Sequence, residues 1–198
     1  MKPLSRLVGN ALIIMNAALI LTQLQGCVGV VAAGGGAGAA VAVDRRSAGT
    51  IVDDETIELK TGNAIFGDDD LGKKAHINIT SFDYVVLLTG ETPTAAMRAR
   101  AVDIARHVDK VRKVYNEIVV AQPTTVKSRA TDTWITAQIK AKLLGNKNVS
   151  STNVKVITEN RTVYLLGMVS HAEAKAATET ARFVDGVVRV IALFEYQD

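Results

Sequence analysis

A repeated unit of about 70 residues constrains the fold of this chain more than any other feature. The segments 77–90 and 154–167 each hold two β-branched runs and end in a glycine at the same spacing. An alanine-rich stretch and a last β-branched run follow each glycine. In each copy we predict a helix, two strands, a second helix and a third strand, in that order. In the first copy these elements lie at 54–65, 77–80, 85–90, 94–108 and 111–120. In the second copy they lie at 132–144, 154–157, 162–167, 172–184 and 187–194. The chain therefore carries the order αββαβ twice.

Each copy predicts a small α+β domain with a three-stranded mixed sheet and two helices packed on one face. Ile77 and Ile79 point to one side of their strand and Asn78 and Thr80 to the other, as a period of two requires. Short turns at 82–83 and 160–161 predict antiparallel hairpins. The many alanines of the second helix in each copy allow that helix to approach its sheet closely.

The first 26 residues have the layout of a bacterial export signal. Lys2 and Arg6 precede an apolar stretch, and residues 24–27 read Leu-Gln-Gly-Cys, which resembles a lipobox. Cys27 is the only cysteine of the chain, so it has no partner for an intramolecular disulfide, and acylation would give it a role. An uncleaved transmembrane anchor is the alternative, because about 18 residues could nearly span a bilayer core. Val28 follows where an aspartate would resemble an inner-membrane retention signal, so we expect a lipid anchor in the outer membrane, facing the periplasm.

The rest of the chain divides by composition and by the repeat. We predict a signal peptide at 1–26, the lipidated cysteine with a flexible Gly/Ala/Val tether at 27–43, a first domain at 44–121, a linker at 122–130 and a second domain at 131–198. Removal of the signal takes away two basic residues and leaves the mature chain with a net charge of +1. The apparent basicity of the full sequence therefore belongs largely to the signal.

The composition excludes several classes of protein. Three histidines and one cysteine leave almost no material for a histidine or cysteine metal cluster or for a disulfide framework. The histidines fall on different predicted elements without a nucleophile at relay spacing, which argues against a catalytic triad. The run from Asp68 to Asp70 lacks the spaced oxygens of a calcium loop and indicates a solvated turn. We expect no enzyme activity, no cofactor and no metal.

The duplicated pattern resembles the BON domain, an αββαβ module of exported bacterial proteins. The resemblance rests on a strand that ends Val-x-Leu-x-Gly, on the alanine-rich helix after it and on a Val-x-x-Val strand, seen at 111–114 and 187–190. Two copies behind a lipobox are similar to the dual-BON outer-membrane lipoproteins. This resemblance implies binding of anionic phospholipid, chiefly through the first helix of the second domain, and support of envelope integrity, with a place at the division site.

The second copy has the residues that such binding needs. Residues 44–121 carry a net charge of −2, whereas residues 122–198 carry +3, which favours contact with anionic headgroups. On the predicted helix at 132–144, Ile135, Ile139 and Leu143 form the core stripe, and Trp134 leads another face. The residues alone do not decide whether Trp134 faces the membrane or packs in the core, and the resemblance favours the membrane. The candidate lipid-binding residues are Trp134, Ala137, Gln138, Lys140, Ala141 and Lys142.

These observations predict a lipid-anchored, non-enzymatic protein whose partner is an anionic phospholipid membrane. Nucleic acid is not expected, because an exported lipoprotein would rarely meet it. The alternative is a periplasmic adaptor whose sheets or Trp134 surface bind an outer-membrane assembly factor, since tryptophan is also common at the centre of protein interfaces.

Overall fold

The computed structural model of the protein describes residues 44–198. The predictions for the signal peptide, for Cys27 and for the whole tether at 27–43 fall outside these residues. Between residues 44 and 198 no helix combines the length and the apolar character needed to cross a membrane.

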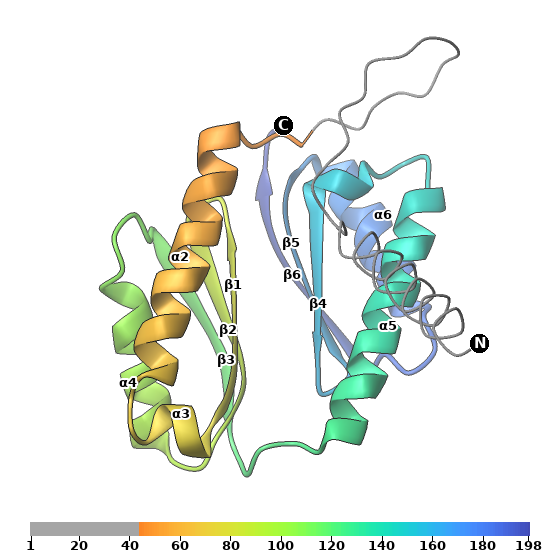
Figure 1. The fold of residues 1–198 in the computed structure, drawn as a ribbon. Helices are drawn as coiled ribbons and strands as arrows, with labels where there is room; N and C mark the ends of the chain where they lie inside the picture. Colours follow the sequence, from red (N-terminus) through yellow and green to blue (C-terminus); the bar gives the residue numbers. More distant parts are fainter. Residues whose placement is uncertain (1–43) are drawn as a thin grey trace, which may run out of the picture. The chain divides into compact units, whose positions relative to one another are not determined.

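Residues 44–198 form two copies of one α+β domain (Figure 1), which confirms the predicted fold class. The first copy contains α2 (Ala48–Phe66), α3 (Leu71–Lys74), β1 (His76–Phe82), β2 (Val85–Thr92), α4 (Ala95–Arg106) and β3 (Lys113–Val120). The second contains α5 (Val126–Gly145), the short 3-10 helix η2 (Ser151–Asn153), β4 (Val154–Glu159), β5 (Thr162–Val169), α6 (His171–Arg182) and β6 (Arg189–Tyr196).

Both first helices begin earlier than the sequence pattern indicated. The hydroxyls of Ser47 and Thr125 accept the backbone N–H groups of Thr50 and Ser128, which caps the two helices at their N-termini. Helix α5 therefore starts at Val126, inside the segment predicted as a linker at 122–130. The connection between the domains is correspondingly shorter.

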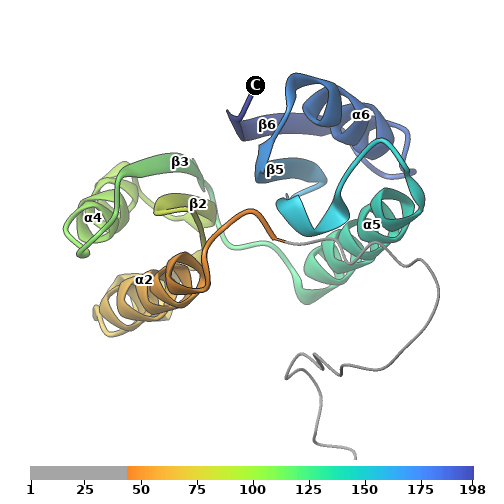
Figure 2. The same cartoon turned by 90° about the horizontal axis from the view of Figure 1, so that it is seen from above.

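The middle strand of each sheet is the second strand of its domain. Strand β2 pairs antiparallel with β1 and parallel with β3, and β5 pairs in the same way with β4 and β6. In each domain the two long helices cover the same face of the sheet (Figures 1 and 2). The predicted three-stranded mixed sheet with helices on one face is confirmed.

A buried aspartate near the start of the first helix holds the hairpin turn in each domain. The carboxylate of Asp54 accepts the backbone N–H groups of Asp83 and Tyr84 at 2.8 and 2.9 Å. Asp132 accepts those of Asn160 and Arg161 at 2.9 and 2.8 Å. All four turn residues have positive φ angles, between 46° and 65°, as a tight two-residue hairpin turn requires. The first turn lies at 83–84, one residue later than predicted, and the second at 160–161, as predicted.

The central strands are buried on both faces. Val86 and Leu88 of β2 point into the core beneath α2 and α4, and Val163 and Leu165 of β5 into the core beneath α5 and α6. The residues between them belong to a third apolar cluster, which joins the two sheets within the described unit and contains Phe82, Leu87, Tyr164 and Leu166. This cluster explains why the runs at 85–88 and 163–166 are continuously apolar instead of alternating.

Candidate lipid-binding surface and interdomain cluster

Helix α5 has one buried face and one exposed face. Ile135, Ile139 and Leu143 are almost completely buried, as their spacing predicts. Trp134 is 66% exposed, so it does not pack in the core. A large aromatic side chain so exposed leaves apolar area in contact with water, and such area is typical of an interaction surface.

The other candidate residues of α5 lie on the accessible side of the helix. Ala137, Lys140, Ala141 and Lys142 are exposed, and Gln138 is partly buried. Positions 134, 138 and 142 follow each other at four-residue spacing, so they share one side of the helix. The Lys142 ammonium donates to the backbone carbonyl of Phe183 at 3.4 Å. This contact places the start of the segment after α6 beside Lys142, on the same side of α5 as Trp134.

That segment supplies two exposed apolar residues that the sequence analysis missed. Phe183 is 79% exposed and Val188 is 70% exposed. Between them, Gly186 lies against the side chain of Ile135, and its carbonyl accepts Arg161 Nε at 2.7 Å. Trp134, Phe183 and Val188 thus lie on α5 and on the loop beside it, and we call these three residues the apolar patch.

The first domain carries polar residues at the three corresponding positions. The shared pattern of the two copies aligns Trp134 with Thr56, Phe183 with His107 and Val188 with Arg112, as the matching aspartates and strand registers require. An alignment of the two copies could therefore have identified Phe183 and Val188 from the sequence.

In the first domain, two of these equivalent residues also interact with carboxylates. Arg112 pairs with Asp83 at 2.6 Å, and His107 lies 3.5 Å from the carboxylate of Asp103. The surface of the first domain therefore presents charge and hydrogen-bonding groups where the second presents apolar groups.

Three exposed basic residues lie on the segments that carry the apolar patch or contact them, and we call these three the basic rim. Lys142 contacts the Phe183 carbonyl, Arg161 contacts the Gly186 carbonyl, and Arg182 directly precedes Phe183. Apolar side chains with a basic rim are the combination expected of a surface that meets anionic headgroups.

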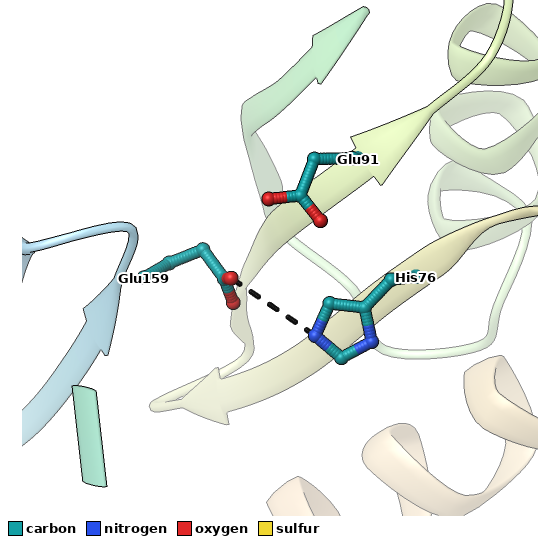
Figure 3. A group of neighbouring side chains, drawn as sticks. All are labelled: His76, Glu91 and Glu159. Carbon is teal, nitrogen blue, oxygen red and sulfur yellow. Dashed lines mark ion pairs between the residues drawn. The ribbon is translucent and has the colours of Figure 1, made fainter. Parts of the chain in front are cut away.

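A second group of functional side chains lies where the two domains meet (Figure 3). His76 begins β1, Glu91 is its register partner on β2, and Glu159 ends β4. One potential ligand atom from each residue lies within 4.8 Å of the other two. Sequence reasoning missed this group because residues from two domains form it, and no local spacing connects them.

The buried carboxyl of Glu159 dominates the electrostatics of this group. Burial raises the pKa of Glu159 to about 7, and the nearby Glu91 carboxylate also raises it, whereas the hydrogen bond from Asn78 opposes the shift. Burial lowers the pKa of His76, and the positive charge of Arg129 lowers it further. Both pKa shifts mean that the neutral form of the side chain is favoured, because burial removes water that would stabilise the charge.

The acidic run at 68–70 forms a turn, as the sequence indicated, but only Asp69 and Asp70 are solvated, because the Asp68 side chain is nearly buried and pairs with Arg100. Asp68 accepts the backbone N–H groups of Asp70 and Leu71, at 3.1 and 3.0 Å. Asp69 and Asp70 pair with Lys73 and Lys74 on the exposed surface.

Fold and surface together define a class of protein: tandem αββαβ domains that differ at the three positions of the apolar patch, which are polar in the first domain and apolar in the second. The sequence matches the BON domain family over residues 53–122 and 131–198. The chain belongs to this family and contains two BON domains.

Three relatives match this chain over most of its length. The chain is 40% identical over 175 residues to Outer membrane lipoprotein DolP of Haemophilus influenzae, covering 88% of this chain and 91% of that one. It is 44% identical over 154 residues to a 21 kDa hemolysin of Actinobacillus pleuropneumoniae, with 78% and 79% covered. It is 36% identical over 157 residues to Osmotically-inducible protein Y of Escherichia coli, with 78% of each chain covered. These three names describe no enzyme.

Proposed function

We propose that this protein is an outer-membrane lipoprotein, anchored through Cys27 and facing the periplasm. It binds anionic phospholipid through its second BON domain. This binding supports envelope integrity at sites rich in such lipid, including the division site. The observation that carries the proposal is the apolar patch. Three positions are apolar and exposed in the second domain, while their equivalents Thr56, His107 and Arg112 are polar in the first.

Insertion of the patch and attraction of the rim would act together. Tryptophan prefers the interface between membrane and water, and Phe183 and Val188 add apolar area beside it. Each basic residue near an anionic surface contributes about 1 kcal/mol, so the rim recruits the domain but needs apolar insertion for firm binding. Residues 122–198 carry a net charge of +3 and residues 44–121 carry −2. Anionic headgroups would therefore attract the second domain and not the first.

The anchor would make this weak binding effective. The lipobox-like segment at 24–27 and the relationship to Outer membrane lipoprotein DolP both support acylation of Cys27 and an outer-membrane location. Acyl chains would hold the domains close to one leaflet, which raises the local concentration of headgroups around the patch.

Vesicle sedimentation tests this proposal. Residues 44–198, which lie within one compact unit and contain both cores, are mixed with phosphatidylcholine vesicles and with vesicles that contain phosphatidylglycerol, at low and high salt. We expect binding only to the anionic vesicles and a loss of binding at high salt. Trp134→Ala should weaken binding roughly tenfold, which corresponds to about 1.4 kcal/mol. Thr56→Ala at the equivalent position of the first domain is the matched control and should change nothing.

The two outcomes separate the candidate functions. Equal binding of Trp134→Ala and the unchanged protein would remove the patch from the mechanism. No binding to either vesicle would contradict lipid recognition by these domains and would favour the adaptor, whose partner would then occupy the Trp134 surface.

A further inference from the structure

The interdomain group has the composition of a metal site. His76 offers an imidazole nitrogen, and Glu91 and Glu159 each offer a carboxylate oxygen, all within 4.8 Å of one another. The side chains of His76 and Glu91 come from adjacent positions of paired strands, and Glu159 reaches them from the second domain (Figure 3). Three protein ligands with an open position for water are typical of sites that bind zinc and similar divalent cations.

One carboxylate oxygen of this group lacks a hydrogen-bond partner. Glu159 is only 7% exposed, and its Oε2 accepts the Asn78 amide at 2.6 Å. Its Oε1 is buried without a hydrogen-bond donor, and the Nε2 atom of His76 lies 3.9 Å away, beyond hydrogen-bond distance. A buried acceptor left unpaired costs free energy, and a cation placed between this oxygen and the imidazole would remove that cost.

We propose that His76, Glu91 and Glu159 bind one divalent transition-metal cation, with Zn²⁺ as its representative, and that this cation links the two BON domains. The imidazole favours zinc-like metals over Mg²⁺ and Ca²⁺, which prefer oxygen ligands alone. A pocket of about 450 Å³, lined in part by His76, Asn78 and Glu159, connects the group to solvent and gives an ion a path of entry. Because bound ligands lie about 2 Å from the metal, the three side chains would have to close in on the ion.

Arg129 opposes this binding and so provides a sharp test. Its Nη1 lies 3.3 Å from His76 Nδ1, where the imidazole can accept a hydrogen bond from the guanidinium. An imidazole bound to metal through Nε2 carries its proton on Nδ1 and no longer accepts this bond. The guanidinium must therefore move away when the metal binds, and its positive charge repels the ion until it does. Removal of this charge should tighten metal binding.

Metal titration of residues 44–198 tests the site, and this fragment lacks the only cysteine of the chain. After treatment with a chelator, the fragment is titrated with Zn²⁺ by calorimetry and with Co²⁺ by visible absorption, which reports coordination by the protein. We expect one ion per chain. Glu159→Gln and His76→Ala should each weaken binding by roughly tenfold or more, and Arg129→Gln should strengthen it.

Matched substitutions elsewhere separate this site from adventitious binding. His171→Ala removes an exposed histidine of the second domain, and Glu179→Gln an exposed carboxylate of α6, so neither should change the affinity. Circular dichroism of each variant confirms that the fold is intact. Absence of binding at millimolar Zn²⁺, or binding that His171→Ala abolishes and Glu159→Gln leaves unchanged, would overturn the proposal. Since the apolar patch is formed by other residues, the vesicle assay and the metal titration can fail independently.

Discussion

At the scale of single residues, the two domains carry different residue types at equivalent exposed positions. They carry the same residue type at positions where the backbone leaves no room for another side chain. Trp134 and Thr56 occupy the same exposed position, and either side chain is compatible with a helix surface. Gly90 and Gly167 are the same residue in both copies because a side chain at either position would collide with the backbone of the neighbouring segment. Gly90 also has a φ of 111°, which side chains rarely permit.

Gly90→Ala should therefore destabilise the protein. The added methyl group would meet the carbonyl of His76, and the backbone would be strained at a cost of about 2 kcal/mol. Urea denaturation followed by circular dichroism measures this loss in the free energy of unfolding. Gly145→Ala is the control, because that position has open space around it and should lose no stability. Equal stability of the two variants would show that β2 can shift to accommodate a side chain.

At the scale of secondary structure elements, a buried aspartate links the first helix of each domain to its hairpin. Asp54 and Asp132 are nearly inaccessible, and each accepts two backbone N–H groups of a turn with positive φ angles. These charge-assisted hydrogen bonds satisfy donors that the turn would otherwise leave unpaired. The contact determines where the helix sits along the sheet, and in the second domain it places Trp134 two residues further along the same helix.

Asp132→Ala should lower the free energy of unfolding by about 3 kcal/mol, because two buried N–H groups lose a charged acceptor. Chemical denaturation provides the measurement. Asp185→Ala removes an exposed aspartate of the same domain and should change stability by less than about 0.5 kcal/mol. If Asp132→Ala were no more destabilising than this control, water would have to satisfy the turn equally well.

At the scale of the whole described unit, apolar packing and ion pairs connect the domains. Phe82 and Leu87 of the first domain share one cluster with Tyr164 and Leu166 of the second. The Lys155 ammonium pairs with the Glu58 carboxylate at 2.7 Å. Most of the connecting stability should come from the apolar cluster, because partly exposed ion pairs contribute little.

Leu166→Ala should therefore weaken both the second domain and its coupling to the first. A buried leucine cut back to alanine costs about 3 kcal/mol, and this side chain contributes to the shared cluster. In scanning calorimetry we expect one transition for the unchanged protein and two for the variant. Leu59→Ala, at an exposed position of α2, should leave the single transition in place. Two transitions in the unchanged protein would show that the domains unfold independently.

Much of this protein could be predicted from its sequence because the relevant signals are local or repeated. The period of two at 77–80, the stripe of Ile135, Ile139 and Leu143, and the equal spacing of the two copies depend only on positions along the chain. They were sufficient for the αββαβ order, for the mixed sheets and for the candidate helix with Trp134. The helix starts were less accurate, because Ser47 and Thr125 act as caps through hydrogen bonds that apolar spacing does not reveal.

Other features depend on contacts between residues far apart in the chain, and only the tertiary structure decided them. Phe183 and Val188 join Trp134 because a loop after α6 runs beside α5. His76 and Glu159 are separated by more than a complete domain copy, and they meet because the faces of two sheets pack together. The sequence by itself determined each domain, since local periodicity and the repeat specify its elements. The site between the domains arose from the packing of one copy on the other, which no spacing within either copy encodes.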